Sequence, residues 1–261
     1  EALAEPGLLK VIGRAGSGVD NIDLEAASAA GIVVMNTPGG NSVAAADHTL
    51  ALLTAMARNV PQAATDLKAG NWNRKRFMGM EVTGKTLGIV GLGRIGREVA
   101  LRAQGLRMDV IGHDPFVSDA AAAGLGIGPR NLPDLLAESD FVTLHLPINS
   151  GTRHVIDGEA LARMKPGARL INCARGGLVD ETALAAALES GHLAGAALDV
   201  FETEPPGSSG LLGMPGVIAT PHLGASTREA QVRVAAEICE KVKTYLMEGT
   251  ALDAVNKVPT G

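Results

Sequence analysis

The sequence predicts an α/β fold in which a parallel sheet carries helices on both faces. From residue 86 onwards, short apolar runs alternate with longer stretches of helical periodicity, the order expected of parallel strands joined by crossover helices. Aromatic residues make up only 2% of the chain and 33 residues are glycine, so small side chains must build a core of closely packed helices and sheet. With 261 residues, 46% of them hydrophobic, the chain has room for one or two such domains.

Charge and composition exclude several classes of protein. The formal net charge of −5 provides no overall positive field to gather nucleic acid or anionic lipid. The longest uncharged stretch, residues 26–46, contains "NTPGGNS", which would break a membrane-spanning helix. Cys173 and Cys239 lie far apart without metal-type spacing, so we expect reduced thiols, no metal site and a cytoplasmic location.

The first part of the chain predicts one small strand-helix-strand unit. "LLKVIG" and "GIVVMN" are the two strands, with a helix near 23–30 between them. One such unit cannot bury both faces of its sheet by itself. A long helix over 42–58 follows, and then "KAGNWNRKRFMG" (68–79), a polar excursion marked by glycine.

The second part predicts a complete six-stranded sheet, the strand count of a dinucleotide-binding fold. The expected strands are 86–90, 108–112, 140–146, 168–173, 195–200 and 216–220. The expected helices are 95–105, 132–138, 157–164, 180–190 and 226–247.

A glycine pattern follows the first of these strands. In "GIVGLGRIGREVA", Gly91, Gly93 and Gly96 stand between an apolar strand and the start of a helix. Such glycines permit a tight turn, the approach of backbone amides to a pyrophosphate, and close packing of helix on strand. Asp114 lies just beyond the next strand, where an acid that binds the ribose is expected.

The acid also bears on the choice of cofactor. A carboxylate at Asp114 would repel a 2′-phosphate, and no arginine follows it in "HDPF", so NAD is favoured over NADP. The alternative interpretation is a structural glycine turn with a surface aspartate. The order of strand, glycines, helix, strand and acid favours the dinucleotide site.

Three polar residues follow successive strands near the end of this part. Arg175 comes after the fourth strand, Glu204 after the fifth and His222 after the sixth, and open α/β sheets bind ligands at that edge. A histidine beside a carboxylate can exchange a proton near neutral pH, and an arginine can hold a carboxylate and polarise a carbonyl. Taken singly, each residue has an alternative interpretation of about equal weight. Glu204 could be a surface charge, His222 a histidine with satisfied hydrogen bonds, and Arg175 an ion-pair partner of Asp180 or Asp199.

These motifs resemble a known family. "NCARGGLVDE", "ALDVFETEP", "TPHLGAST" and "GLGRIGRE" are similar to the signatures of the D-isomer-specific 2-hydroxyacid dehydrogenases, along nearly the whole chain. The resemblance implies a Rossmann-type NAD domain, a doubly wound parallel sheet, beside an incomplete flavodoxin-like substrate domain. It implies that Arg175 binds the substrate carboxylate and carbonyl, that Glu204 supports His222, and that His222 exchanges the proton.

The resemblance extends to substrate residues. "VIGRAGSGVDNID" is similar to the family's substrate loop, and "MNTPGGNSVAAAD" to its hinge, where Asp47 stands at a position commonly Glu. The family's counterpart of residues 68–79 lies at a dimer interface, although "RKR" alone reads as solvated surface. The implied substrate is a small phosphorylated 2-hydroxy acid, with interconversion of 3-phosphoglycerate and 3-phosphohydroxypyruvate. The residues assigned to the substrate are Arg14, Ser17, Gly18, Asn41 and Arg74.

The family pattern assigns the remaining contacts and the domain limits. Cofactor contacts are expected from Gly91, Gly93, Arg94, Ile95, Gly96, Asp114, Pro115, His145, Pro147, Cys173, Ala174, Asp199 and Gly224. The NAD domain is expected over 38–225, with 1–37 and 226–261 as segments of the substrate domain. Members of the family begin earlier, so we expect an N-terminally truncated substrate domain and no regulatory domain.

Two alternative functions remain open at this stage. The nearest is another dehydrogenase of the same family, such as a glyoxylate or hydroxypyruvate reductase, which differs only in the phosphate ligands. The other is an NAD-sensing corepressor-like binding protein, since corepressors with this fold carry the same three residues. A homodimer through the NAD domain is expected, and in a corepressor-like protein NAD would promote dimerisation and peptide binding.

Overall fold

The computed structural model describes residues 3, 7–207 and 209–258; the terminal positions 1–2, 4–6 and 259–261 lie outside the described residues. The chain forms two compact units. Unit 1 combines residues 1–44 with 225–261, and unit 2 is the continuous stretch 45–224. In the described part of the chain, no helix is both long and apolar enough to cross a lipid bilayer.

Unit 2 is built on a parallel sheet of seven strands. The strands are β3 (Thr86–Val90), β4 (Asp109–His113), β5 (Gly128–Pro129), β6 (Phe141–Leu144), β7 (Arg169–Asn172), β8 (Gly195–Leu198) and β9 (Val217–Ala219). Their spatial order is β5-β4-β3-β6-β7-β8-β9, and every neighbouring pair is parallel. The order runs outward from β3 in both directions, so the predicted doubly wound α/β fold is confirmed.

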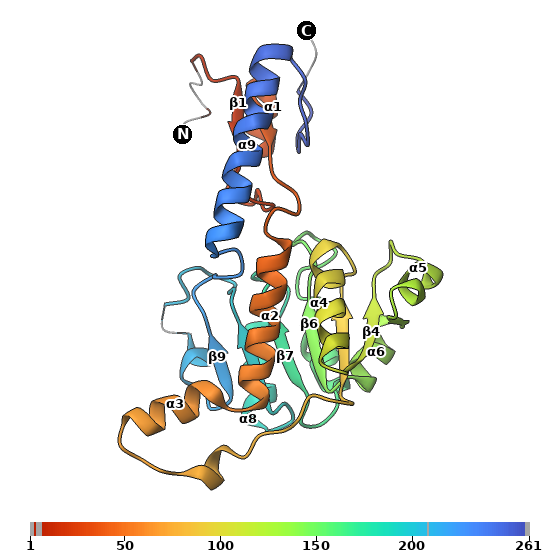
Figure 1. Ribbon diagram of the computed structural model, residues 1–261, viewed down its shortest axis with the longest axis vertical. Helices are drawn as coiled ribbons and strands as arrows, with labels where there is room; N and C mark the ends of the chain where they lie inside the picture. Colours follow the sequence, from red (N-terminus) through yellow and green to blue (C-terminus); the bar gives the residue numbers. More distant parts are fainter. Residues whose placement is uncertain (1–2, 4–6, 208, 259–261) are drawn as a thin grey trace. The chain divides into compact units, whose positions relative to one another are not determined.

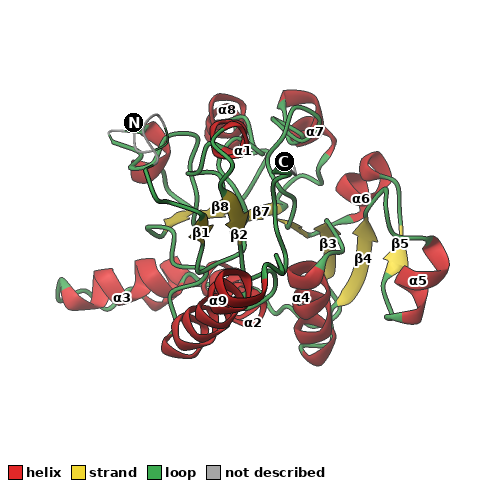
Figure 2. Ribbon diagram, turned by 90° about the horizontal axis from the view of Figure 1, so that it is seen from above, coloured by secondary structure: helices red, strands yellow, loops and turns green. Residues whose placement is uncertain are grey.

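Helices cover both faces of this sheet. α2 (Ser42–Ala57) and α4 (Arg94–Gly105) lie on one face, and α6 (Leu132–Glu138), α7 (Gly158–Arg163) and α8 (Glu181–Glu189) on the other (Figure 2). Each face buries its own apolar cluster. Among the described residues the largest fully buried side chain is Phe141, and those next in size are Ile, Leu and Met, so the expected aliphatic core is confirmed.

The expected count of six strands is wrong. The additional strand, β5, has two residues, and the helix before it, α5 (Asp119–Gly124), has six. A glycine-proline pair at the sheet edge produces no alternation, and "DAAAAG" carries no apolar periodicity, so neither element leaves a readable pattern. The short 3₁₀ helix η2 (Gly210–Gly213) was also not expected.

A long arm, residues 59–79, projects from the rest of unit 2 between α2 and β3 (Figure 1). It contains α3 (Val60–Lys68), which buries none of its residues, and the 3₁₀ helix η1 (Arg74–Phe77). The Met80 backbone N–H donates to the Ala57 carbonyl (2.9 Å), so the chain returns to the end of α2 before it enters the sheet. The arm therefore lies at the amino ends of the strands.

Unit 1 contains the expected strand-helix-strand unit and a long helix. Its elements are β1 (Val11–Gly13), α1 (Leu24–Ala29), β2 (Val33–Met35) and α9 (Arg228–Glu248), and the two strands are parallel. A segment after α9 extends this sheet, which the sequence did not predict. The Val255 N–H donates to the Val34 carbonyl (2.9 Å), and the Val34 N–H donates to the Asn256 side-chain oxygen (2.8 Å).

Lys241 on α9 ties the parts of unit 1 together. Its Nζ donates to the Asn36 carbonyl (3.0 Å) and pairs with Glu237 (2.5 Å) and Asp253 (2.7 Å), while only 10% of the side chain is exposed. Burial opposes the charge, but the hydrogen bonds to Asp253 and Glu237 outweigh it and raise the pKa of Lys241. The ammonium is thus a shared partner for three oxygens.

Replacing Lys241 with methionine should destabilise the protein. The substitution leaves a buried carbonyl and two carboxylates without their donor, so we expect a loss of about 1–3 kcal/mol in the free energy of unfolding, measured in urea. Lys243→Met is the matched control, because Lys243 is exposed and its ion-pair partner among the described residues is the exposed Glu240. Equal unfolding midpoints for the two variants would contradict this role of Lys241.

Candidate active site

The glycine turn after β3 leaves the start of α4 open. A Cβ on Gly91 would lie 2.6 Å from the His145 carbonyl oxygen, and one on Gly96 would lie 2.0 Å from the Gly91 carbonyl oxygen, so neither position has room for a side chain. A Cβ on Gly93 would meet nothing within 4 Å. Gly93 caps α4 without a side-chain hydrogen bond, so the first amides of α4 face open space and suit a phosphate group.

Asp114 lies beside this turn, as the sequence predicted. Its Oδ2 accepts a hydrogen bond from the Leu92 N–H (2.8 Å) and its Oδ1 accepts one from the Phe116 N–H (2.8 Å). These bonds fix the carboxylate next to the turn, and each oxygen keeps a further lone pair for a ribose hydroxyl. Glycine turn, open helix start and acid together fit the phosphate and ribose of a dinucleotide.

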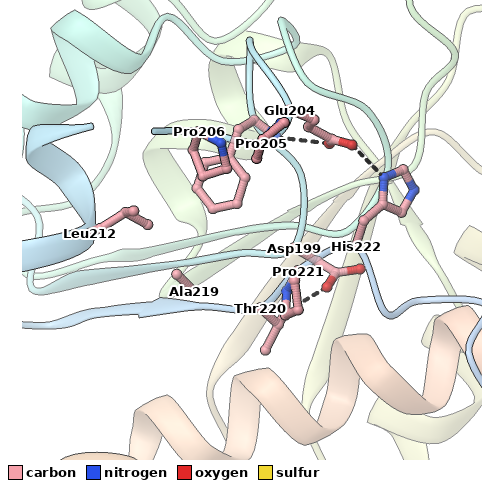
Figure 3. A pocket seen from close by; sticks show the side chains of 10 residues that line it. Asp199, Glu204, Pro205, Pro206, Leu212, Ala219, Thr220, Pro221 and His222 are labelled. Carbon is pink, nitrogen blue, oxygen red and sulfur yellow. Dashed lines mark hydrogen bonds and ion pairs between the residues drawn. The ribbon is translucent and has the colours of Figure 1, made fainter. Parts of the chain in front are cut away.

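Glu204 and His222 meet at the same edge of the sheet. His222 Nδ1 lies 2.8 Å from Glu204 Oε2, and the two side chains point toward one another in Figure 3. Glu204 Oε1 also accepts the Phe201 N–H (3.2 Å). An ionised carboxylate can only accept, so this contact requires a proton on Nδ1 and leaves Nε2 available to a ligand. The His222 side chain is 51% exposed, which leaves the ring accessible.

The turn that presents His222 is held by Asp199. The carboxylate accepts the backbone N–H groups of Leu223 and Gly224, each at 2.8 Å, and the Asp199 carbonyl accepts the His222 N–H at 2.9 Å. His222 has φ of 56°, a conformation that L residues seldom adopt, so the turn needs such support. Asp199 and Gly224, assigned to the cofactor from the family pattern, are thus bonded to one another.

Two residues that the sequence interpretation missed complete the surroundings of Asp199. His48 Nε2 lies 3.1 Å from Asp199 Oδ1, and Thr220 Oγ1 donates to the same oxygen at 2.5 Å. Burial opposes ionisation of Asp199, but the bonds from His48, Thr220 and the two amides outweigh it and lower the pKa of Asp199. The sequence around His48 carries no signal for this role, because His48 and Asp199 are 151 positions apart.

Arg175 leaves β7, the strand next to β8, in a turn that a buried asparagine supports. Asn172 Nδ2 donates to the Arg175 carbonyl (2.9 Å), and Asn172 Oδ1 accepts the Ala174 N–H (3.1 Å). Asn172 was also missed, because within "RLINC" it reads as part of the strand. Arg175, Glu204 and His222 therefore all follow strands at the carboxyl edge of one sheet.

A pocket of about 370 Å³ adjoins the Glu204–His222 pair (Figure 3). Its remaining wall is largely apolar and includes Phe201, Pro206 and Leu212. One side of the pair therefore adjoins a largely apolar surface.

The other residues assigned to the cofactor occupy the same edge. Arg94 and Ile95 open α4, Pro115 follows Asp114, His145 and Pro147 follow β6, and Cys173 and Ala174 follow β7. Burial raises the pKa of the Cys173 thiol to about 12, so this cysteine stays protonated. Desolvation lowers the pKa of His145 to about 3, so its ring is neutral although part of the residue reaches solvent.

The substrate residues predicted in unit 1 share one loop system. Ser17 Oγ donates to Asn41 Oδ1 (2.9 Å), Gly18 follows Ser17, and Arg14 NH1 donates to the Ala15 carbonyl (2.7 Å). The Arg14 Nε is buried and has no hydrogen-bond partner among the residues that the structure describes. These positions gather the polar groups that a carboxylate or phosphate would require.

Arg74 lies apart from the other polar site residues of unit 2. It is exposed on η1, in the arm at the amino ends of the strands, whereas Arg175, Glu204 and His222 follow the carboxyl ends of β7, β8 and β9. Within one chain the structure does not bring Arg74 to these residues.

Comparison with known proteins identifies the family. The model described as "D-isomer specific 2-hydroxyacid dehydrogenase, NAD binding domain" matches residues 50–224. The chain belongs to this family. The glycine turn, Asp114 and the Glu204–His222 pair all lie within the matched residues, and the NAD-binding domain of the 2-hydroxyacid dehydrogenases accounts for most of unit 2.

Similar members of the 2-hydroxyacid dehydrogenase family are D-3-phosphoglycerate dehydrogenases. The Bacillus subtilis protein of that name is 49% identical over 248 residues, 95% of this chain and 47% of that protein. The Homo sapiens protein is 53% identical over 247 residues, 95% of this chain and 46% of that protein. The chain thus spans about half the length of these curated relatives.

Solved structures of 2-hydroxyacid dehydrogenases have the same fold. A glyoxylate reductase from Paecilomyes thermophila matches with a TM-score of 0.87 and 39% identity, over 94% of this chain and 75% of that one. A D-mandelate dehydrogenase from Rhodotorula graminis in its holo form matches with a TM-score of 0.90 and 33% identity, over 97% and 76%.

The neutral His145 predicts a pH dependence of stability. Its pKa is about 3 in the folded protein against about 6.5 in an unfolded chain. The unfolded state therefore binds the extra proton below about pH 6.5, and stability falls with pH by up to about 1.4 kcal/mol per unit towards pH 3. In urea unfolding at pH 7 and pH 5, His145→Gln should lose less stability than the parent protein.

A control separates this effect from a general loss of histidines. His192→Gln removes a histidine whose Nε2 contacts the Leu161 carbonyl (3.1 Å) elsewhere in unit 2. Equal losses of stability in His145→Gln and the parent protein between pH 7 and pH 5 would contradict the lowered pKa of His145 in the folded protein.

Proposed function

We propose that this chain carries the NAD-binding and proton-transfer groups of a dehydrogenase that interconverts 3-phosphoglycerate and 3-phosphohydroxypyruvate, the entry to serine synthesis. The observation that carries the proposal is the hydrogen-bonded Glu204–His222 pair, at the sheet edge that also holds the open start of α4 and Asp114. Relatives named D-3-phosphoglycerate dehydrogenase at about half identity support the choice of substrate.

The residues at the sheet edge have distinct roles in holding the cofactor. The amides at the start of α4 bind the pyrophosphate of NAD, Gly91 and Gly93 allow its approach, and Asp114 accepts hydrogen bonds from the ribose. Bound NAD supplies the acceptor for the hydride that leaves C2 of the acid.

Proton transfer falls to His222. Nε2 of its ring takes the proton of the substrate hydroxyl, while Glu204 holds Nδ1–H and stabilises the imidazolium that results. Arg175 binds the substrate carboxylate and polarises the oxygen at C2, because a guanidinium offers paired donors in one plane. Arg14, Ser17 and Asn41 contribute to binding of the acid and its phosphate.

Turnover by this chain tests the proposal. NADH consumption with 3-phosphohydroxypyruvate should exceed that with hydroxypyruvate by at least roughly 100-fold in kcat/KM, because unpaired phosphate ligands disfavour the smaller acid. His222→Ala should lower kcat by roughly 10³-fold, since it removes the acid/base group, with the Kd for NADH within about twofold.

The other outcomes are equally informative. Equal efficiency with both acids would favour a glyoxylate or hydroxypyruvate reductase, the candidate that the Paecilomyes structure supports. Retained turnover in His222→Ala would remove His222 from its role. NADH binding without reduction of either acid would contradict the proposed reaction.

The exposed apolar side chains of the arm support a second copy of this chain as its partner. Large apolar side chains of the arm are exposed although such groups normally lie inside, for example Val60 at 53%, Leu67 at 55%, Trp72 at 77% and Met78 at 81%. Burial of this surface against a partner subunit would stabilise a homodimer. In such a dimer Arg74 would reach the substrate phosphate of the partner.

Sedimentation tests the dimer. The parent protein should sediment as a dimer at micromolar concentration. Trp72→Asp should shift it to monomer, because the substitution places a charge at an exposed apolar position in the loop that connects α3 to η1. Leu101→Asp is the control, since Leu101 is 65% exposed on α4, outside the arm. A monomeric parent protein at high concentration would rule out the proposed role of Arg74.

A further inference from the structure

The loop that carries Glu204 is tied to the start of α8 by two glutamates. The Glu202 N–H donates to Glu181 Oε1 (2.6 Å), and the Glu181 N–H donates to Glu202 Oε1 (3.1 Å). Each carboxylate thus accepts the backbone amide of the other residue. Reciprocal bonds of this kind fix two segments in both position and direction.

This pairing has an electrostatic cost. Burial and the neighbouring charge of Glu202 raise the pKa of Glu181, although the bond from the Glu202 amide acts in the opposite direction. Repulsion between the carboxylates of Glu181 and Glu202 opposes the stability that their hydrogen bonds provide. A local conflict of this kind is expected where the sequence serves function.

His154 joins the same cluster from the loop after β6. Its Nε2 lies 3.1 Å from Glu202 Oε1, and its backbone N–H donates to the Gly177 carbonyl at 2.8 Å. Its φ of 50° is rare for an L residue. His154 therefore links Glu202 to Gly177, the second glycine after Arg175.

The turn after Arg175 also touches the Glu204 loop directly. A Cβ on Gly176 would lie 1.8 Å from the Phe201 carbonyl oxygen, so the two backbones are in contact. The Phe201 N–H in turn donates to Glu204 Oε1, and Glu204 Oε2 holds His222. A displacement of residues 201–202 would therefore displace the carboxylate from the imidazole.

We propose that Glu181, Glu202 and His154 form a positioning clamp that holds Glu204 against His222 and keeps the Arg175 turn in register with both. The clamp lies outside the residues that touch substrate or cofactor. This inference rests on the proposed function, in which His222 exchanges the proton. Misplacement of a catalytic group by about 1 Å can cost two orders of magnitude in rate, which sets the scale of the expected effect.

Kinetics of variants test the clamp. Glu202→Ala and Glu181→Ala should each lower kcat for 3-phosphohydroxypyruvate by roughly 10- to 100-fold. Because Arg175 also binds the substrate, KM should rise, but by a smaller factor than that by which kcat falls. The Kd for NADH should stay within about twofold, because the residues that hold NAD keep their own hydrogen bonds. Glu202→Gln and Glu181→Gln should each keep kcat within about threefold of the parent value, since an amide oxygen still accepts the partner's N–H. Glu159→Ala is the control, an acid in the first turn of the neighbouring helix α7.

Coupling to Glu204 separates positioning from general stability. In a Glu204→Gln background, Glu202→Ala should lower kcat by no more than about twofold further, because the bond that it positions is already weakened. Equal fold losses in both backgrounds, or a rise in KM that accounts for the whole effect, would overturn the clamp.

A spectroscopic measurement keeps the two proposals apart. In the NMR spectrum of the chain labelled with ¹⁵N-histidine, Glu202→Ala should move the His222 ring signals towards those of Glu204→Gln, whereas Glu159→Ala and Glu202→Gln should leave them in place. This result would support the clamp even if the parent chain reduced neither acid, an outcome that contradicts the proposed function alone. Unmoved His222 signals in Glu202→Ala would overturn the clamp.

Discussion

The buried carboxylate of Asp199 is the interaction on which the candidate site depends. It lies at the end of β8 without exposure to solvent, and its hydrogen bonds fix the amides that follow His222. A carboxylate that accepts hydrogen bonds from several directions can hold a non-glycine residue in a left-handed conformation. The direction of the His222 ring, and with it the bond to Glu204, follows from that support. A neutral amide in place of Asp199 would offer one accepting oxygen in place of two.

Much of the fold and the central site residues could be predicted from the sequence. The strands of the sheet interior are continuous apolar runs bounded by glycine and polar residues, and helix α6 was placed at its observed limits, 132–138. Gly91, Gly93, Gly96 and Asp114 could be recognised because their spacing reflects a backbone requirement that few other residues satisfy. Arg175, Glu204 and His222 could be placed at one edge because parallel strands end there together.

The remaining features depend on contacts between distant residues. β5 is too short to show alternation, and α3 has no buried face whose periodicity would reveal it. His48 bonds to Asp199, 151 positions away, so nothing in its local sequence distinguishes it from a core histidine. Asn172 supports the turn that holds Arg175, but its position at the end of an apolar run makes it read as part of the strand. The bonds between Glu181 and Glu202 join residues that both read as surface acids. Hydrogen-bond partners across loops follow from the fold and not from the pattern that predicts it.

The pairing of residues 253–256 with β2 has a consequence for the order in which the chain folds during synthesis. Val34 and Asn256 are 222 positions apart, with the whole of unit 2 between them. Unit 2 is continuous and its neighbouring strands are mostly joined by short crossovers, so it can fold as soon as it leaves the ribosome. Unit 1 can complete its structure only after residues 253–256 have been synthesised, and until then β1 and β2 lack these partners. The cofactor-binding half is then formed before the half that holds Ser17 and Asn41.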